Sequence, residues 1–324
     1  MPVRLSAGAA VKISEVDEGT LIGAFVPFLP TGCQTVIGPG DDCAVVKAPD
    51  SRYVITTDML VEGSHFKREW SSAFEIGQRA AAQNLADVAA MGAHPTSLVC
   101  SLALPPSLEV SWLVDFAKGL ADRARPLGCG VVGGDLTQSR TLAISVTALG
   151  DMAGLQPVLR SGAKVGDRIV LAGTLGYSAT GLELLSEGRK ARSQREQQAV
   201  QIFRAPNPPL QMGPTLAKAG ASAMMDVSDG LLKDARRIAK ASQVRMDLDY
   251  SLLKPFISAL EGSCADPLDN VLCGGEDHAL LATIPSHIEL PTGLRAIGKV
   301  MAGEGVCLDG KLLSASGGWE SYRH

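Results

Sequence analysis

The stretch FEIGQRAAAQNLADVAAMGAHPTSLVCSLAL, residues 74–104, indicates the fold class. Its first part, 74–91, repeats apolar and small residues at the three- and four-residue spacing of an amphipathic helix. Its last part, 97–104, is an apolar run of strand length. A helix that is followed by a strand predicts an α/β or α+β protein in which helices cover sheets.

The same two patterns recur along the 324 residues. Further predicted elements are helices at 111–125, 179–185 and 231–241, and strands at 53–57, 142–149 and 168–172. At roughly 150 residues per domain, the length predicts two domains. Because the segment 151–167 is rich in turn residues, we expect an N-terminal domain over 1–150 and a C-terminal domain over 151–324.

Composition argues against several classes of protein. The net charge is −4 and no Lys/Arg-rich run occurs, so a nucleic-acid partner is not expected. No stretch reaches the roughly 18 apolar residues of a membrane span, and no signal peptide is found at the amino terminus. We therefore expect a cytoplasmic protein without a membrane partner. The seven cysteines include no C-x-x-C pair and the five histidines form no zinc-binding motif.

Two segments resemble phosphate-binding motifs, but neither has the required context. Residues 128–133 match G-x-G-x-x-G, yet they precede an apolar strand and no helix follows the last glycine. Residues 305–312 approach the Walker pattern, but Leu312 stands where a hydroxyl residue would bind Mg²⁺.

Acidic residues instead gather in predicted turns at the ends of apolar runs. These turns are Gly40-Asp41-Asp42, Thr56-Thr57-Asp58, Gly133-Gly134-Asp135, Asp226-Val227-Ser228-Asp229-Gly230 and Gly274-Gly275-Glu276-Asp277. A single Gly-Asp pair is ordinary turn chemistry. Five together point to Mg²⁺, which prefers carboxylate oxygens together with substrate phosphates.

A sixth acid lies in the predicted helix at 74–91. At 100° per residue, Asn84 and Asp87 share a stripe with Ile76, Ala80 and Met91, which are apolar or small. A buried carboxylate is costly without a partner, so we expect Asp87 to meet a cation, a hydrogen-bond donor or a metal. A solvated edge of the stripe is the alternative.

These motifs resemble the thiamine-monophosphate kinase family in their order and spacing over nearly the whole chain. The matching segments are residues 38–45, 56–66, 84–93, 133–135, 160–167, 226–231 and 274–277. Gly-Asp-Asp and Gly-Gly-Asp also occur across the wider aminoimidazole ribonucleotide synthetase superfamily. The resemblance implies a two-domain fold, with an N-terminal domain that forms a β-barrel through dimerisation and a C-terminal α/β sandwich domain. It also implies a homodimer that converts ATP and thiamine monophosphate into ADP and thiamine diphosphate by direct in-line transfer.

The resemblance further implies roles for individual residues. Those matching the ligands of several Mg²⁺ ions are Asp42, Thr56, Thr57, Asp58, Asp87, Asp135, Asp226 and Asp229. Those matching ATP contacts are Gly134, Asp135, Arg160 and Ser228, and those matching substrate contacts are His65, Glu276 and Trp319. The chain departs from the family at Leu136, at Gln138, and at His278, where tyrosine is usual.

The charges of the chain and of the two substrates agree with the activity that the resemblance implies. Both substrates are polyanions and the chain is net negative, so the acids need metal ions between them and the phosphates. The attacking phosphate is already largely dianionic at neutral pH, so no residue is expected to act as general base. The alternatives are another ATP-using enzyme of the same superfamily and a non-catalytic protein that binds Mg²⁺ and nucleotide.

Overall fold

The computed structural model describes residues 11–39 and 44–313, so Asp42 and Trp319 lie outside the described residues. Its α-helices are α1 (Glu18–Phe25), α2 (Ala73–Ala90), α3 (Val110–Ala124), α4 (Tyr177–Ser186), α5 (Gln194–Arg204), α6 (Met212–Ala219), α7 (Leu231–Ser242), α8 (Tyr250–Leu260) and α9 (Pro267–Cys273). Short 3-10 helices are η1 (Ile13–Glu15), η2 (Val26–Phe28) and η3 (Arg125–Leu127).

The strands are β1 (Thr35–Ile37), β2 (Val45–Val46), β3 (Val54–Val61), β4 (His94–Leu104), β5 (Gly130–Gln138), β6 (Ala143–Asp151), β7 (Arg168–Ala172), β8 (Ala223–Val227), β9 (Arg245–Leu248), β10 (Ala279–Ile284), β11 (Arg295–Met301), β12 (Gly305–Leu308) and β13 (Lys311–Leu312). The described chain divides into two compact units. Unit 1 comprises the described residues up to Val88 together with His94–Ala153. Unit 2 comprises Ala89–Ala93 and the described residues from Gly154 onward.

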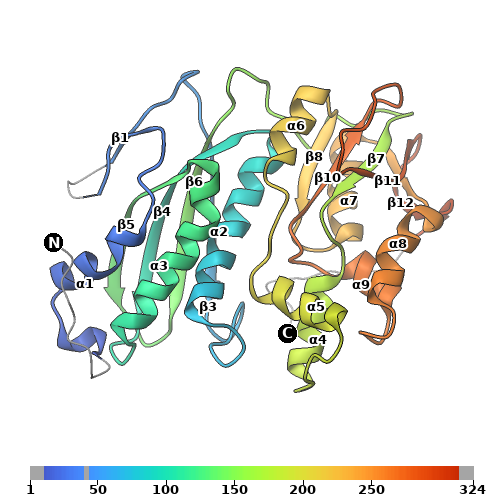
Figure 1. Ribbon diagram of the computed structural model, residues 1–324. Coiled ribbons are helices and arrows are strands. Elements are labelled where there is room, and N and C mark those ends of the chain that lie inside the picture. The colour runs from blue at the N-terminus through green and yellow to red at the C-terminus, as the bar shows by residue number, and fades with distance from the viewer. Residues whose placement is uncertain (1–10, 40–43, 314–324) are drawn as a thin grey trace. The chain divides into compact units, whose positions relative to one another are not determined.

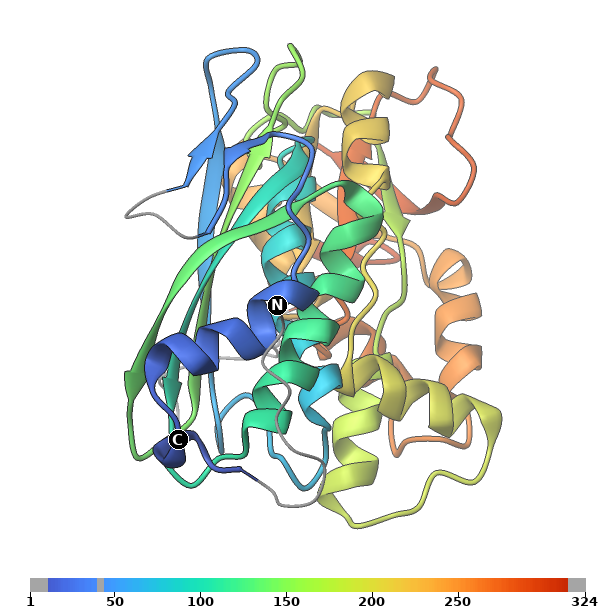
Figure 2. The same ribbon diagram turned by 60° about the vertical axis from the view of Figure 1, so that its left-hand side comes forward.

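In unit 1 the described strands form a sheet in the order β3-β6-β4-β5, beside the small β1-β2 pair. Strands β4 and β5 are parallel, and the other neighbours in the larger sheet are antiparallel. Helices α2 and α3 cover one face, and α1 lies beside α3 (Figures 1 and 2). A reciprocal capping box between Ser72 and Glu75 begins α2. The backbone N–H groups of these two residues therefore have hydrogen-bond acceptors at the start of the helix.

The second face of this sheet carries exposed apolar side chains. Ile144 and Val146 of β6 point to the face that the helices cover, and both are buried. Ile55 and Met59 of β3 point to the second face, and they are 69% and 58% exposed. Within one chain the sheet is open, with β3 and β5 at its edges, so the expected barrel is not formed by this chain alone. Closing a sheet requires its two edge strands to find partners.

In unit 2 the described strands form a mixed sheet in the order β13-β12-β9-β11-β7-β10-β8. Its two faces pack against different helices because side chains alternate along each strand. Ile169 and Leu171 of β7 belong to a large core that includes residues of α7, α8 and α9. Val170, between them, packs in a smaller core with Leu216 of α6. This two-sided burial confirms the mixed α/β class expected from the sequence.

Most predicted elements agree with the structure to within a few residues. The helix predicted at 74–91 is α2, and the strand predicted at 168–172 is β7. Strand β3 continues to Val61, four residues beyond its predicted end. No helix in the described ranges combines the length and apolar character that crossing a membrane requires.

Candidate active site

The first cluster of predicted site residues lies between β3 and α2 in unit 1. Thr56 and Asp58 are two residues apart on β3, so their side chains point to the same face, which α2 covers. The Thr56 hydroxyl donates to Oδ2 of Asp87 at 2.8 Å. The backbone N–H of Asp58 donates to Oδ1 of Asn84 at 3.0 Å. Because Asn84 and Asp87 are one helical turn apart, both face the strand, and the structure brings Thr56, Asp58 and Asp87 together.

Thr57 lies on the opposite face of β3. Its side chain is exposed, its hydroxyl donates to the Val146 carbonyl at 3.0 Å, and it accepts from the Thr147 hydroxyl at 3.1 Å. Of Thr56 and Thr57, only Thr56 points to the face of the sheet that α2 covers, where it contacts Asp87.

Asp135 is also separated from this cluster. In the register of the sheet, Asp135 lies opposite Ser101, Ser101 opposite Ser145, and Ser145 opposite Met59. Directly opposed residues point to one face, so Asp135 shares the open face with Met59 rather than the helix face with Asp58. Three strand spacings also put β5 about 14 Å from β3. Within one chain, Asp135 is therefore not part of the cluster that contains Asp58 and Asp87.

Two of the predicted acidic turns are strands. Thr56-Thr57-Asp58 lies inside β3, and Gly133-Gly134-Asp135 lies inside β5. At Gly134 a Cβ atom would come within 2.0 Å of the Cys100 carbonyl oxygen, so this position requires glycine for the close approach of β4 and β5. Gly134, which suggested a turn, instead allows two strands to pack closely.

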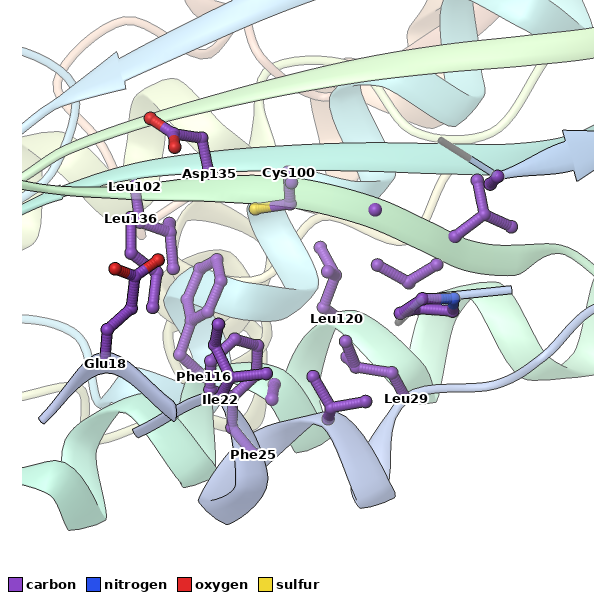
Figure 3. A pocket seen from close by; sticks show the side chains of 18 residues that line it. Glu18, Ile22, Phe25, Leu29, Cys100, Leu102, Phe116, Leu120, Asp135 and Leu136 are labelled. Atoms are coloured by element: carbon purple, nitrogen blue, oxygen red, sulfur yellow. The ribbon is translucent and has the colours of Figure 1, made fainter. Parts of the chain in front are cut away.

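A cavity of about 340 Å³ lies on the helix face of β4 and β5. Its walls include Ile22 and Phe25 of α1, Phe116 of α3 and Leu102 of β4 (Figure 3). Glu18 and Asp135 also line it, but Figure 3 shows the Asp135 carboxylate on the far side of its strand from the apolar side chains. The cavity supplies apolar surface and is separate from the acids between β3 and α2.

The second cluster is in unit 2, where two of the sequence motifs meet. Asp226 is the fourth residue of β8, and residues 228–230 form the turn into α7. The backbone N–H groups of Glu276 and His278 donate to the carbonyls of Ser228 and Val227 at 2.8 and 3.1 Å. A Cβ atom at Gly275 would come within 2.3 Å of the Ser228 carbonyl oxygen, so glycine permits this contact. The structure therefore brings Asp226, Ser228, Asp229 and Glu276 together.

Cations neutralise part of the second cluster. The Asp229 carboxylate accepts from Arg237 and lies 3.4 Å from the Lys233 ammonium. Arg237 also reaches Asp234, which is fully buried, with an Nη1–Oδ1 distance of 2.5 Å. Burial, and then the charge of Asp226, raise the pKa of Asp234 to about 7. Asp229 thus belongs to an ion-paired network around the start of α7.

Asp226 has a different partner. Its Oδ2 lies 3.1 Å from Nδ1 of His278, and both side chains are buried. The neighbouring Asp277 is buried as well and accepts hydrogen bonds from the Thr174 hydroxyl and from the backbone N–H groups of Tyr177 and Ser178, at the start of α4. Burial raises the pKa of Asp277 to about 6, although these hydrogen bonds oppose the shift.

The remaining predicted residues are not in these clusters. The carbonyl of Arg160 accepts from Ser242, the last residue of α7, so it lies about 18 Å from the helix start near Asp229, the length of twelve helical residues. His65 lies in the turn after β3, where its Nδ1 accepts from the Val61 N–H at 3.0 Å, so its hydrogen is on Nε2.

Several contributing residues were not predicted as site residues from the sequence. Asn84 appeared only as a neighbour on the stripe of Asp87. Asp234 and Arg237 are three apart on the predicted helix at 231–241, a spacing that indicates a side-chain pair. The pairing of His278 with Asp226 links residues 52 positions apart, and no local signal could have revealed it.

The donor set between β3 and α2 fits Mg²⁺. Within residues 11–39 and 44–313, no three His, Cys, Asp or Glu side chains come together as a ready metal site. Asp58 and Asp87 instead offer hard carboxylate oxygens from two facing elements. Mg²⁺ is usually held by one or two carboxylates together with waters and substrate phosphates, so the chemistry of these two acids fits a part of such a site.

Comparison with known proteins agrees with this arrangement. Residues 40–152 match the N-terminal domain of AIR synthase related proteins, and residues 164–287 match their C-terminal domain. The chain resembles a solved structure of AaThiL complexed with AMPPCP and TMP, with a TM-score of 0.77 and 34% identity over 87% of this chain and 91% of that one. Hydrogenase maturation protein HypE, at 18% identity and a TM-score of 0.68, shares the fold.

Two thiamine-monophosphate kinases illustrate the closeness of the sequence match. The protein from Mycobacterium tuberculosis H37Rv is 43% identical over 96% of this chain and 93% of its own length. The one from Escherichia coli K12 is 34% identical over 89% of this chain and 91% of its own. The matched length covers both units, and the identity over it places the chain in the thiamine-monophosphate kinase family.

Proposed function

We propose that this chain transfers the γ-phosphoryl group of ATP to thiamine monophosphate, which yields ADP and thiamine diphosphate. The observation that carries the proposal is the facing pair Asp58 and Asp87 in a chain 43% identical to a thiamine-monophosphate kinase over 96% of its length. The AaThiL complex with AMPPCP and TMP supports both substrates.

Mg²⁺ is the proposed cofactor. Asp58 and Asp87 would hold it, with the Thr56 hydroxyl fixing the orientation of Asp87. When bound, the ions neutralise and align the polyphosphate. The other proposed ligands are Asp42, Thr57, Asp135, Asp226 and Asp229. Asp229 would have to share its carboxylate with Arg237 and Lys233, which favours Asp226 as the stronger ligand of unit 2.

The chain's own residues act by positioning. The terminal phosphate of thiamine monophosphate has a second pKa of about 6, so it attacks without losing a proton to the protein. Gly134, Arg160 and Ser228 are the proposed ATP contacts, and His65, Glu276 and Trp319 the proposed substrate contacts. His65 is held with its Nε2–H as the donating group, which suits a phosphate oxygen. Correct alignment of the two polyanions supplies much of the acceleration.

A homodimer is part of the proposal. Unit 1 presents Ile55 and Met59 on an open sheet face between the two edge strands β3 and β5. A second copy would cover this face and provide partners for the edges. Because Asp135 lies on the other face and the other edge from Asp87, a site that uses both acids takes Asp135 from one chain and Asp87 from the other.

The test is a coupled assay of ADP release with purified protein. We expect release that requires both Mg²⁺ and thiamine monophosphate and stops with excess chelator. Thiamine without its phosphate is the matched control, and it should give no ADP because it lacks the dianionic nucleophile. ADP release independent of thiamine monophosphate, or nucleotide binding without turnover, would overturn the proposal.

A further inference from the structure

His278 occupies a buried position that is unusual for its residue type. Its side chain is 3% exposed, and its Nδ1 lies 3.1 Å from Oδ2 of Asp226. Leu280 of β10 lies opposite Asp226 of β8, and His278, two residues before Leu280, is therefore the diagonal neighbour of Asp226. The backbone N–H of His278 also donates to the Val227 carbonyl. Both its backbone and its ring are therefore fixed against the end of β8.

The backbone at this point is in the left-handed region. His278 has φ +50°, and Glu276, two residues before it, has φ +63°. Residues other than glycine seldom adopt such angles, and they persist where the surrounding structure imposes them. Two such residues directly after Gly274-Gly275 indicate that this segment is shaped to hold particular side chains.

The chemistry of the pair fixes the direction of its hydrogen bond. A carboxylate that serves as a metal ligand is ionised and only accepts hydrogen bonds. Nδ1 of His278 must then carry the hydrogen and donate it to Oδ2. This bond restricts the rotation of the carboxylate.

The carboxylates around the start of α7 have separate partners. Arg237 holds Asp234 and Asp229, whereas His278 holds Asp226. The His278 ring therefore makes a restraining contact with Asp226 that is separate from the contacts of Arg237.

We propose that His278 is a positioning residue that orients the Asp226 carboxylate for a divalent cation bound with nucleotide. The inference rests on the proposed function, because it takes Asp226 as a metal ligand. It assigns a task to a position where this chain departs from the tyrosine usual in the family. Outer partners of metal ligands commonly change metal affinity by about 10- to 100-fold when they are lost.

Two substitutions separate orientation from backbone strain. His278→Asn and His278→Gly both tolerate the left-handed backbone. Only asparagine can donate a side-chain N–H from near the Nδ1 position. We expect His278→Gly to weaken Mn²⁺ binding about 10- to 100-fold, measured by electron paramagnetic resonance with a non-hydrolysable ATP analogue. His278→Asn should retain most of the affinity, and His287→Gly, at an exposed histidine of the same unit, should leave it unchanged.

A double-mutant cycle with Asp226→Asn tests whether the effect passes through Asp226. If it does, His278→Gly causes little further loss of Mn²⁺ affinity in the Asp226→Asn protein. Equal Mn²⁺ affinity of wild type and His278→Gly, or equal losses in the glycine and asparagine variants, would overturn the inference. A full additional loss in the Asp226→Asn background would also overturn it.

The failure of this inference is distinct from failure of the proposed function. Wild-type protein that binds Mn²⁺ and nucleotide but releases no ADP with thiamine monophosphate contradicts the function, whatever the variants do. A wild type with normal turnover and a His278→Gly variant with unchanged KM for Mg²⁺ contradicts only the role of His278. Melting temperatures of all variants, measured by circular dichroism, show whether each one is folded.

Discussion

The two units hold their acidic residues by different means. Between β3 and α2, Asp87 accepts from the neutral hydroxyl of Thr56, and the backbone N–H of Asp58 is bound by the Asn84 side chain. Around the start of α7, Asp229 and Asp234 share Arg237, and Lys233 lies close to Asp229. A hydroxyl orients a carboxylate without cancelling its charge, whereas an ion pair cancels much of it.

This difference indicates separate roles for the contacts in the two units. In unit 1, a hydroxyl and an amide side chain connect β3 to α2, and Asp58 and Asp87 lie on these two facing elements. In unit 2 the arginine and the lysine stabilise the turn before α7 and reduce the charge that a polyanionic substrate meets. Asp226, held by His278, is the exception there.

The largest effect is expected at Asp87. Asp87→Asn should keep the fold, because the amide oxygen still accepts from Thr56, but it should lower turnover by orders of magnitude, because the amide lacks the ligand's charge. ADP release at saturating Mg²⁺ measures this. The control is Asp115→Asn, at an exposed residue of α3 paired with Lys118. Near-wild-type turnover of Asp87→Asn would remove Asp87 from the metal site.

A smaller effect, on stability rather than chemistry, is expected at Arg237. Arg237→Met leaves the buried Asp234 without this cation and should lower the free energy of unfolding by about 3 kcal/mol. Urea unfolding followed by circular dichroism measures the change. Lys118→Met, at an exposed pair with Asp115, should cost less than about 1 kcal/mol. Similar losses in the two variants would contradict a special role for Arg237.

The smallest effect is a pH dependence of stability that arises at Asp277. Its folded pKa is raised from 3.8 to about 6, so the folded state holds its proton more tightly than the unfolded state. This contribution to stability is complete below pH 3.8 and is lost as the pH rises through about 6. Melting temperatures between pH 4 and 7 should therefore show a downward contribution from Asp277.

Asp277→Asn cannot titrate, so its melting temperature should vary less over the same pH range, even if it is lower throughout. The difference between the two melting curves, rather than either curve alone, reports the contribution of Asp277. Parallel curves for wild type and Asp277→Asn would contradict the raised pKa.

Much of the fold could be predicted from local patterns. Helical periodicity predicted α2 and α7, and the apolar run at 168–172 predicted β7. These elements are amphipathic or apolar over several turns or the whole strand, so neighbouring residues carry the signal. The stripe shared by Asn84 and Asp87 likewise predicted that Asp87 meets a cation, a hydrogen-bond donor or a metal, and the Thr56 hydroxyl of β3 is such a donor.

The remaining features depend on contacts between distant residues. Gly133-Gly134-Asp135 was expected to form a turn, but Gly134 serves the close packing of β5 on β4. The face that Asp135 occupies follows from the register of four strands, which no single segment encodes. The pairing of Asp226 with His278 similarly depends on β8 lying beside β10. Strand order is set by the whole fold, so local sequence could not reveal these relations.

We propose that the unit 1 site is shared, with Asp87 and Asp135 contributed by two different chains. Differently tagged Asp87→Asn and Asp135→Asn chains can be co-expressed, and the mixed dimer purified through both tags. We expect each parent dimer to be nearly inactive and the mixed dimer, with one intact site of two, to recover about half of wild-type turnover. A mixed dimer of Asp87→Asn with Asp58→Asn should recover none, because these acids lie in one cluster. An Asp87→Asn/Asp135→Asn dimer no more active than its parents would contradict the claim.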